Sequence, residues 1–470
     1  MEKKKTYLVT YTDGNIVAEK AIEVLGVAKT RYKDGVALME TEAEPAANDV
    51  LHFENLGVTR LSLSAEEAKK IAEKTEVLAV EEDCEVFPLY DSYTEDDLEE
   101  LEEIDENSLE DEDFDEDFLL EELLPEAKRS NRRKYKPGKH PLHHRPFISP
   151  QKNLIMRRVL RDVYRSLLRN IPNKFRREET VYQEIPWNIS LVQAPSAWRR
   201  KIDGRGVKVA VLDTGIANHV DLTVCGGASF VPGISSYHDD HGHGTHCAGI
   251  IAARNNGHGV VGVAPKAMLY AVKVLPKEGS GLISYVIAGL EWCIRHKMNV
   301  ASMSLGSPCE PIVAMATIIK RCQDSGITVV ASAGNSYGRH FPWVGAPANS
   351  FMQGEPNASP IAVGAVDRNG VIAPFSSRGS CVNESNPVTC VAPGVSVEST
   401  CLNNSYTKMS GTSMACPHVS GLAALIIQRY PSITPAQVKR LITRTAIDLG
   451  DTSNDSTFGF GLINCDEATR

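Results

Sequence analysis

Three glycine-rich stretches, far apart in the sequence, contain residues that could together perform acyl transfer. They are Asp213-Thr214-Gly215, His243-Gly244-Thr245-His246 and Gly411-Thr412-Ser413. A serine hydroxyl is a poor nucleophile at neutral pH and needs an imidazole to accept its proton, while a carboxylate orients that imidazole and stabilises its charged form. Taken singly, each residue has a simpler explanation, such as a turn aspartate, a buried histidine or a helix N-cap serine. Together they supply a nucleophile, a base and an orienting group.

The part of the chain that carries these residues alternates between strand and helix patterns from about residue 182 onward. The expected strands are Val207–Leu212, Met268–Val274, Val300–Met303, Ile327–Ser332 and Ile361–Val366, and the expected helices include Gly281–His296 and Ile312–Ser325. This alternation predicts a parallel sheet covered by helices on both faces. Such sheets bind their ligands at the carboxyl ends of the strands, which is where Asp213 follows its strand. His243 and Ser413 each precede a run of small apolar residues that suits a buried helix.

The chain order Asp, His, Ser on this scaffold resembles the subtilisin family of serine endopeptidases, for which that order is known. The resemblance covers roughly Gln183 to Asn464 and implies an α/β fold: a three-layer α/β/α catalytic domain with a mainly parallel sheet. It implies that Ser413 is the nucleophile, His243 the general base and acid, and Asp213 the orienting carboxylate. Asn335, in Ala331-Ser332-Ala333-Gly334-Asn335, matches the oxyanion-stabilising asparagine, and His246 would be structural.

The substrate cleft is expected to bind a peptide as an added strand. The stretch Ser302–Gly306 resembles the family's cleft strand, so Ser304, Leu305 and Gly306 are expected to contact substrate. Tyr337–Pro360 does not align with the simpler family pattern, and no side-chain preference is predicted for the first specificity pocket. Cys247 and Cys416, close to His243 and Ser413, are interpreted as small buried thiols through which mercurials could inhibit.

A calcium ion is implied by the same resemblance. The run Arg254–Val260 matches the family's tight calcium loop without a gap, and Gln183 and Asp221 stand near the expected distant positions. The implied ligands are the side chains of Gln183, Asp221 and Asn256 and the backbone carbonyls of Arg254, His258 and Val260. Ca²⁺ prefers such an all-oxygen shell. The alternative is a plain Asn-Gly turn at Asn256.

Residues 1–90 form a small α+β module by their pattern. Strands are expected at Tyr7–Tyr11, Val36–Met39 and Val77–Glu81, and a capping box at Ser64 and Glu67 begins a helix that runs to about Lys74. Before a subtilisin-like domain, this module resembles the family's ferredoxin-like inhibitory propeptide, most closely at Leu78–Asp83. The resemblance implies a zymogen that is cut autocatalytically. Cleavage could follow Tyr90, or occur near Arg132–Lys134 or near Val181.

Two linkers of opposite charge separate this module from the catalytic domain at 182–470. Residues 91–126 hold 20 acidic residues and no Lys or Arg, and residues 127–177 hold 17 Lys or Arg and one acidic residue. The basic linker, 127–181, contains an amphipathic basic helix at Asn153–Asn170. We hypothesise that the two linkers pair with each other. Binding of nucleic acid or of an anionic membrane ranks below this pairing, because the neighbouring carboxylates would neutralise the helix.

Composition limits the remaining possibilities. The 470 residues are 42% hydrophobic and contain no apolar run of 18 residues, which excludes wholesale disorder and a membrane-spanning helix. No standard secretory signal is recognised, so a cytoplasmic monomer is expected, with export by a non-standard route as the alternative. The eleven cysteines are interpreted as mostly free thiols; a Cys381–Cys390 pair would fit export.

Two other functions compete with a zymogen of a calcium-stabilised serine endopeptidase. A pseudoprotease would keep the fold but not the activity, although all the expected active-site residues are present. A metal-dependent hydrolase could use the cluster of His238, Asp239, Asp240, His241 and His243. It is disfavoured because no metalloprotease helix motif accompanies that cluster.

Overall fold

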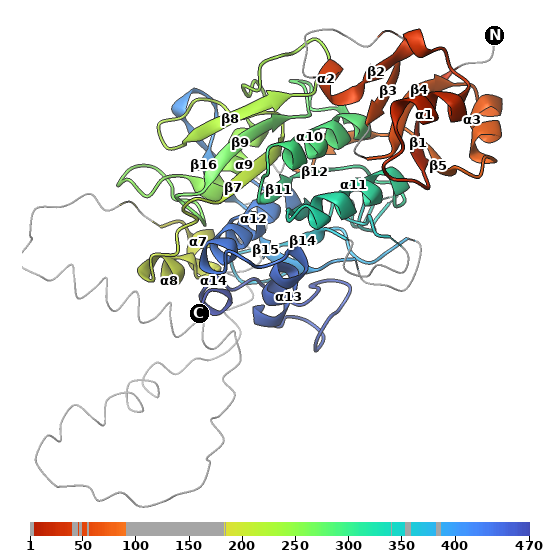
Figure 1. Cartoon of the computed structure of the whole chain (residues 1–470). Helices are drawn as coiled ribbons and strands as arrows, with labels where there is room; N and C mark the ends of the chain where they lie inside the picture. Colours follow the sequence, from red (N-terminus) through yellow and green to blue (C-terminus); the bar gives the residue numbers. More distant parts are fainter. Residues whose placement is uncertain are drawn as a thin grey trace, which may run out of the picture. The chain divides into compact units, whose positions relative to one another are not determined.

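The computed structural model describes residues 4–90 and 183–470, except 40–45, 47–48, 54–55, 184, 340, 353–358 and 382–386 (Figure 1). These residues fall in one compact unit. The acidic and basic linkers, the helix expected at Asn153–Asn170 and the cleavage sites considered near Arg132–Lys134 and Val181 lie outside the described residues. Within the described part, no helix combines the length and apolarity that crossing a membrane requires.

A seven-stranded sheet forms the centre of the catalytic domain, in the order β15-β14-β13-β11-β7-β9-β8. Every neighbouring pair in it is parallel. Its strands are β7 (Lys208–Asp213), β8 (Val224–Ser229), β9 (Met268–Lys273), β11 (Val300–Met303), β13 (Thr328–Ser332), β14 (Ile361–Val366) and β15 (Cys390–Pro393). Most of these strands are continuously buried, because helices cover both faces. The predicted parallel sheet is confirmed, and the five expected strands lie within one residue of their observed ends.

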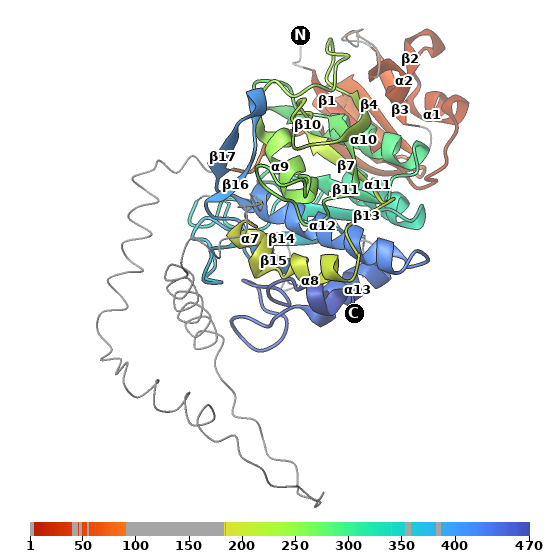
Figure 2. The same cartoon turned by 90° about the vertical axis from the view of Figure 1, so that its left-hand side faces the viewer.

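Helices flank the sheet on both sides. On one face lie α10 (Ile283–Arg295) and α11 (Val313–Asp324), and on the other α9 (His243–Ala252) and α12 (Thr412–Arg429) (Figures 1 and 2). All ten residues of α9 are buried, including the polar His243, Thr245 and His246. The three-layer α/β/α prediction is therefore confirmed. Smaller elements are α7 (Trp187–Leu191), α8 (Ala194–Arg199), β10 (Gly281–Leu282), β12 (Leu305–Gly306), β16 (Val397–Thr400), β17 (Tyr406–Met409), α13 (Pro435–Thr445), α14 (Cys465–Ala468) and a 3-10 helix at Leu402–Asn404.

The N-terminal module has its own five-stranded sheet, in the order β2-β3-β4-β1-β5. Its elements are β1 (Lys5–Tyr11), α1 (Ala18–Leu25), a 3-10 helix at Lys29–Arg31, β2 (Tyr32–Asp34), α2 (Gly35–Met39), β3 (Val50–Phe53), β4 (Val58–Leu63), α3 (Ala65–Ala72), β5 (Val77–Glu82) and β6 (Glu85–Pro88). Strands β3, β4, β1 and β5 pair antiparallel in the ferredoxin-like arrangement, and β2 adds a parallel edge strand. The predicted small α+β module is confirmed.

Two local predictions in this module have opposite outcomes. The capping box is present, with the Ser64 hydroxyl accepting from the Glu67 N–H and the Glu67 carboxylate accepting from the Ser64 N–H. The strand expected at Val36–Met39 is wrong, because this stretch lies in the short helix α2. The Asp34 carboxylate accepts a 2.9 Å hydrogen bond from the Ala37 N–H, and alanine, leucine and methionine favour helix.

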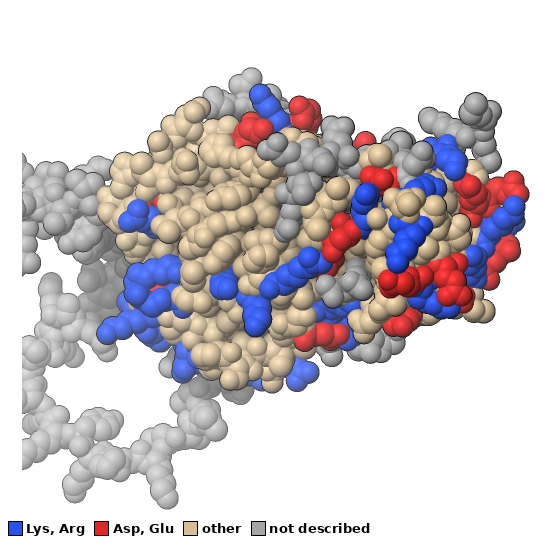
Figure 3. Space-filling model, turned by 45° about the horizontal axis from the view of Figure 1, so that its top comes forward, with Lys and Arg blue, Asp and Glu red and all other residues tan. Residues whose placement is uncertain are grey.

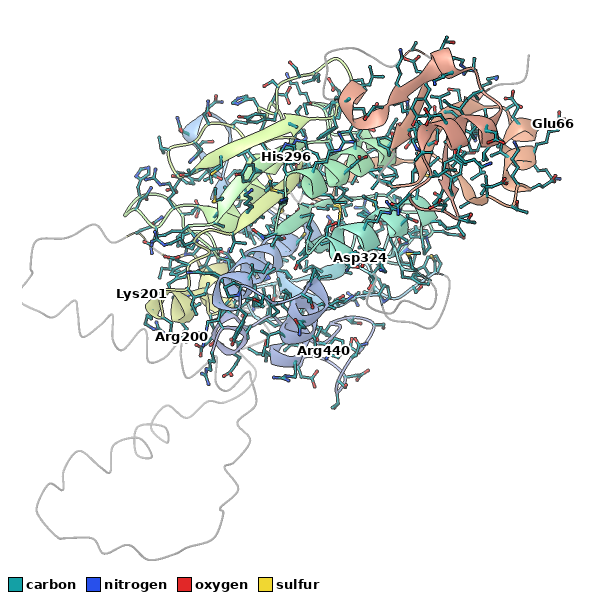
Figure 4. All side chains as sticks on the ribbon, viewed as in Figure 1. Glu66, Arg200, Lys201, His296, Asp324 and Arg440 are labelled. Carbon is teal, nitrogen blue, oxygen red and sulfur yellow. The ribbon has the colours of Figure 1, made fainter. Side chains whose placement is uncertain are left out.

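Charged side chains are unevenly distributed over the surface. On the face shown in Figure 3, Lys, Arg, Asp and Glu crowd the N-terminal module at the right, while most of the catalytic domain's visible face is uncharged. Exposed helix faces carry ion pairs one turn apart, such as Lys70 with Glu66 on α3 and Lys320 with Asp324 on α11. Glu66 and Asp324 are labelled in Figure 4. Such exposed pairs contribute little stability, so burial of the apolar faces holds these helices in place.

Candidate active site

Asp213 and His243 meet at the carboxyl edge of the sheet. Asp213 is the last residue of β7 and His243 the first of α9, and both side chains are fully buried. The Asp213 Oδ1 lies 2.7 Å from the His243 Nδ1 and also accepts from the Thr214 N–H at 2.7 Å. Because the carboxylate can only accept, the Nδ1 carries the proton and the Nε2 is left as the basic nitrogen. That Nε2 has no hydrogen-bond partner in the described part of the chain.

Ser413 lies in the first turn of α12 and contacts the segment that follows β6. Its hydroxyl donates to the Ser304 carbonyl at 2.8 Å and accepts from the Leu89 N–H at 2.8 Å. Its backbone N–H donates to the Leu89 carbonyl at 3.0 Å. The hydroxyl is thus turned toward Ser304 and Leu89 and makes no hydrogen bond with the His243 Nε2.

Asn335 has an unpaired amide nitrogen close to Ser413 and Leu89. Its Oδ1 accepts from the Thr412 N–H at 3.0 Å and from the Thr412 hydroxyl at 2.8 Å, which fixes the Nδ2 on the opposite side. The Nδ2 is buried and has no partner among the described residues. Gly411, at φ +156°, has the Leu89 carbonyl and the Asn335 Nδ2 against its α-carbon, where a side chain would collide with that carbonyl. The Leu89 carbonyl therefore accepts from one potential oxyanion donor, the Ser413 N–H, and lies beside Gly411, as does a second, the Asn335 Nδ2.

Strand β6 occupies the cleft that leads to these residues. It lies between β10 and β12 in a three-stranded antiparallel sheet. Phe87 is opposite Gly306 and Pro88 opposite Leu305, and the Leu89 N–H also donates to the Ser304 carbonyl at 3.4 Å. The structure thus places Ser304, Leu305 and Gly306, the residues expected to contact substrate, beside strand β6 and Leu89. It also shows β10 on the other edge, which sequence reasoning missed because Gly281 and Leu282 were assigned to a helix.

The Leu89 side chain packs against Gly306 and forms part of the wall of a small cavity near Ser413. The rest of this pocket wall is formed by Gly306, Ser307, Pro308, Ser332, Ala333, Gly334, Ser336, Trp343, Gly345, Ala346 and Ser377. Apolar and small residues dominate this wall, which suits an uncharged aliphatic side chain. Trp343 comes from the stretch Tyr337–Pro360 that could not be aligned to the family pattern, so only the structure identifies it as a pocket residue.

The histidines around the site differ in their surroundings. The Tyr90 ring lies 5.3 Å from the His243 ring, and the Tyr90 hydroxyl is 3.5 Å from the His241 Nε2. Burial, together with the charge of His243, lowers the pKa of His241. His246 is fully buried and its Nε2 donates to the Thr407 carbonyl at 3.0 Å; burial lowers its pKa to about 3, so it stays neutral. This geometry gives His246 a structural contact, in line with its expected role.

The two neighbouring cysteines are buried thiols. Burial raises the pKa of Cys247 well above its ordinary value and that of Cys416 to about 12. The Cys247 Sγ lies 3.5 Å from the Ser413 carbonyl. Both are therefore protonated and only weakly nucleophilic at neutral pH.

The carboxylates considered as metal ligands for a metal-dependent hydrolase make hydrogen bonds and an ion pair with other side chains instead. Asp239 accepts from the Thr214 and Thr245 hydroxyls at 2.8 and 2.6 Å, and Asp240 pairs with Lys273 at 2.7 Å. Over the described residues, the one group of three potential metal ligands is Asp213, His243 and Cys247. His238, Asp239, Asp240 and His241 do not belong to it. The geometry therefore supports a proton-relay pair at Asp213 and His243 better than a metal centre at the predicted cluster.

The loop Arg254–Val260 brings oxygen atoms together around Gln183. The Gln183 Nε2 faces three backbone carbonyls, those of Arg254 at 3.0 Å, His258 at 2.5 Å and Val260 closer still. An amide nitrogen has two N–H donors, so it cannot pair with all three carbonyl oxygens, and oxygen atoms are the ligands that Ca²⁺ prefers.

Asp221 adds an unneutralised charge next to this point. Its carboxylate is fully buried, and its oxygens accept from the Asn256 Nδ2 at 2.9 Å, the Val260 N–H at 3.1 Å and the Tyr406 hydroxyl at 3.2 Å. Within the described chain, Asp221 has no salt-bridge partner. A buried carboxylate without a cation is costly, so the residues present fit a bound cation better than a plain turn.

Comparisons with known proteins agree with this arrangement. The model of the subtilase family matches residues 204–461. M-protease from Shouchella clausii is 48% identical over 291 residues, which cover 62% of this chain and 71% of that protein. Subtilisin Savinase from Lederbergia lenta is 48% identical over 288 residues, or 61% of this chain and 100% of Savinase. Thermostable alkaline protease from Halalkalibacterium halodurans is 46% identical over 293 residues, or 62% and 76% of the two chains. The chain therefore belongs to the subtilase family of serine proteases.

Proposed function

We propose that this chain is the zymogen of a serine endopeptidase that cuts peptide bonds through an acyl-enzyme intermediate. The observation that supports this most directly is the position of Leu89. Its side chain lies at the pocket wall, its N–H faces the Ser304 carbonyl, and its carbonyl oxygen accepts from the Ser413 N–H. A peptide segment of the chain itself thus lies in the orientation that attack by Ser413 requires.

The reaction follows from the groups around that carbonyl. The Ser413 hydroxyl turns from the Ser304 carbonyl toward the His243 Nε2, loses its proton to it and attacks the carbonyl carbon. Asp213 holds the Nδ1 and stabilises the imidazolium. The Ser413 N–H and the Asn335 Nδ2 stabilise the negative oxygen. His243 then protonates the leaving amine, and water, activated by the same imidazole, releases the acyl group.

The first substrate of this centre is the bond between Leu89 and Tyr90. Leu89 supplies the pocket side chain and the carbonyl, so Tyr90 becomes the new N-terminal residue of the cleaved chain. This shifts the expected cut by one residue from the position after Tyr90. We propose that the module at 1–90 then inhibits the enzyme, because β6 remains paired with both β10 and β12 and blocks the cleft.

The module also contributes to the fold of the catalytic domain at two helix N-termini. The Glu81 carboxylate accepts from the Val313 and Ala314 N–H groups, at 2.8 and 3.0 Å, at the start of α11. The Asp83 carboxylate accepts from the Ser284 N–H at 2.9 Å and the Ser284 hydroxyl at 2.7 Å at the start of α10. Neither helix has a side-chain cap from its own N-cap residue, so the module satisfies these donors from outside. This supports a role of the module in folding as well as inhibition.

The experiment that tests the function is labelling with a fluorophosphonate, which reacts with activated serines. The native chain should be labelled once its N-terminal fragment has been removed, and Ser413→Ala should not. Ser420→Ala is a matched control, since Ser420 is a buried serine further along α12. N-terminal sequencing of the cleaved native chain should begin at Tyr90. Labelling that persists in Ser413→Ala would contradict the assignment.

We propose calcium as a structural ligand of this enzyme. Gln183, Asp221 and Asn256 would hold it with their side chains, and Arg254, His258 and Val260 with their carbonyls. The buried, unpaired charge of Asp221 and the crowded carbonyls around Gln183 support this proposal. The ion would tie the start of the catalytic domain to the loop after α9 and has no part in bond cleavage.

A further inference from the structure

Two cysteines face each other across the contact between the N-terminal module and the catalytic domain. Cys84 directly precedes β6, and Cys309 follows β12 by three residues. In the antiparallel β6–β12 ladder, Pro88 is opposite Leu305 and Phe87 opposite Gly306. Because the two strands are antiparallel, the residues that precede β6 and those that follow β12 lie at the same end of this pair, which brings Cys84 and Cys309 to one place. Both side chains are partly buried against the same apolar core, and both are free thiols.

The two thiols interact directly. The Cys84 thiol donates to the Glu82 carbonyl at 3.4 Å, and the interaction with Cys84 is the largest cause that lowers the pKa of Cys309, to about 7. The side chain of Ser307 and the backbone of Ala346 lower it further. The same contact raises the pKa of Cys84. The interaction thus makes Cys309 the more acidic thiol of the pair, unlike the buried Cys247, Cys293 and Cys416, whose pKa values are raised by burial.

We propose that Cys84 and Cys309 form a reversible disulfide that locks the N-terminal module onto the catalytic domain. The oxidant is a low-molecular-weight disulfide, such as oxidised glutathione. The Cys309 thiolate attacks one sulfur of the oxidant, whose S–S bond breaks and releases one thiol. Cys84, deprotonated in turn, attacks the Cys309 sulfur of the mixed disulfide and releases the second thiol. The two protein thiols lose two electrons and two protons, which the oxidant gains.

The effect of this disulfide on enzyme activity rests on the proposed function. Formation of the disulfide rests only on the proximity of Cys84 and Cys309. After cleavage at Leu89, a non-covalently held module leaves the cleft by dissociation or degradation. A disulfide keeps β6 at a high effective concentration next to β10 and β12, so the cleft stays occupied. Reduction by a thiol then releases the module. The chain would remain inhibited under oxidising conditions and become active under reducing ones.

The bond is tested on the full-length Ser413→Ala chain, which cannot cut itself. After treatment with oxidised glutathione, a non-reducing protease digest analysed by mass spectrometry should contain one peptide pair joining Cys84 to Cys309. Cys84→Ser and Cys309→Ser should lack it, and Cys225→Ser, which removes an exposed thiol on β8, should retain it. Cys309 joined only to glutathione, or to the nearby Cys381, would overturn the proposal.

The consequence is tested on the active chain. On a non-reducing gel, the oxidised and cleaved chain should run as one species and separate into two on addition of dithiothreitol, with peptidase activity rising on the order of tenfold. Cys84→Ser should separate without reductant and show no such rise. Equal activation of Cys84→Ser and the native chain would overturn the lock. If the cross-link forms but neither activity nor fluorophosphonate labelling follows reduction, the disulfide stands and the proposed function fails.

Discussion

The amide of Asn335 is the clearest example of a residue whose structural contacts define a chemical role. Its side-chain oxygen accepts two hydrogen bonds from Thr412. Its side-chain nitrogen is buried beside the Leu89 carbonyl and has no hydrogen-bond partner among the described residues. A buried donor left unpaired costs free energy, which is recovered when a negatively charged oxygen forms there. The Asn335 Nδ2 thus lacks a hydrogen-bond partner before the reaction and gains one when the oxyanion forms.

Asn335→Ala should therefore lower kcat and leave KM nearly unchanged. The expected loss is roughly 100- to 1000-fold, the value known for this asparagine in subtilisin itself. Steady-state kinetics with a short peptide substrate measures it. Asn349→Ala is the control: this asparagine holds the Cys309 and Val344 carbonyls and should act on stability instead. A large rise in KM with unchanged kcat would contradict an oxyanion role.

Single residues also show where sequence patterns were sufficient. Asp213, His243 and Ser413 were identifiable because each lies in its own glycine-rich motif, and the structure places all three at the same edge of the sheet. The pocket residue Trp343 and the pair of Cys84 and Cys309 carry no such motif. They come together only through the packing of loops and the pairing of β6 with β12, which depend on tertiary structure.

At the level of elements, α10 and α11 depend on carboxylates from another part of the chain. Glu81 and Asp83 accept from N–H groups at their N-termini, and Asp83 is also paired with Arg60 at 2.9 Å. Burial raises the pKa of Glu81 while the hydrogen bonds from Val313 and Ala314 oppose the rise. Removing such a cap usually costs about 1–2 kcal/mol.

Glu81→Ala should accordingly lower the unfolding free energy of the full-length Ser413→Ala chain by about 1–2 kcal/mol. Urea unfolding followed by fluorescence measures the change. Glu85→Gln serves as the matched control, because that carboxylate lies on β6 but is exposed and should change stability by less than about 0.5 kcal/mol. Equal losses in the two variants would argue against capping by Glu81.

Helix α12 carries a buried histidine that makes the fold sensitive to acid. The His418 Nδ1 donates to the Met414 carbonyl, and its Nε2 accepts from the Asn188 Nδ2, both at 2.8 Å. Burial lowers its pKa to about 4. In the unfolded chain His418 takes up a proton near pH 6.5, but in the folded chain only near pH 4. The contribution of His418 to the free energy of unfolding is therefore fully present above pH 6.5 and is lost as the pH falls from 6.5 to 4.

His418→Gln should remove the contribution of His418 to the pH dependence of the free energy of unfolding. Between pH 7 and pH 5, the Ser413→Ala chain should lose about 2 kcal/mol more than the Ser413→Ala/His418→Gln chain. Urea unfolding at the two pH values provides the comparison, and His246 contributes equally to both chains. Parallel losses in the two chains would show that His418 is not held neutral.

Two secondary-structure predictions, for Val36–Met39 and for Gly281 and Leu282, were wrong, and the observed elements explain why. Val36–Met39 was assigned to a strand because all four side chains are apolar, but the Asp34 carboxylate starts a helix there. Gly281 and Leu282 were assigned to a helix, although they pair with β6 before α10 begins. Both short stretches are apolar, and short apolar runs do not distinguish strand from buried helix. Longer strands of the central sheet, enriched in valine and isoleucine, were predictable to within a residue.

For the whole molecule, the strongest expected dependence is on calcium. A ligand that binds only the folded state stabilises it by about 2.7 kcal/mol at one hundred times its dissociation constant. The thermal midpoint of the Ser413→Ala chain should therefore rise with added Ca²⁺ and fall with a chelator. Asp221→Asn should abolish this response, and Asp324→Asn, an exposed carboxylate on α11, should keep it. A midpoint insensitive to Ca²⁺ in all three chains would contradict the site.

The pairing of β6 on both of its edges has a consequence for which polypeptides the mature enzyme can digest. A segment that replaces β6 must offer its main-chain groups to β10 and β12 at once, so it cannot already belong to a sheet or a helix. Well-folded neighbours in the same compartment would be spared, while damaged or nascent chains, frayed ends and long surface loops would be cut. Selection by conformation thus precedes selection by side chain.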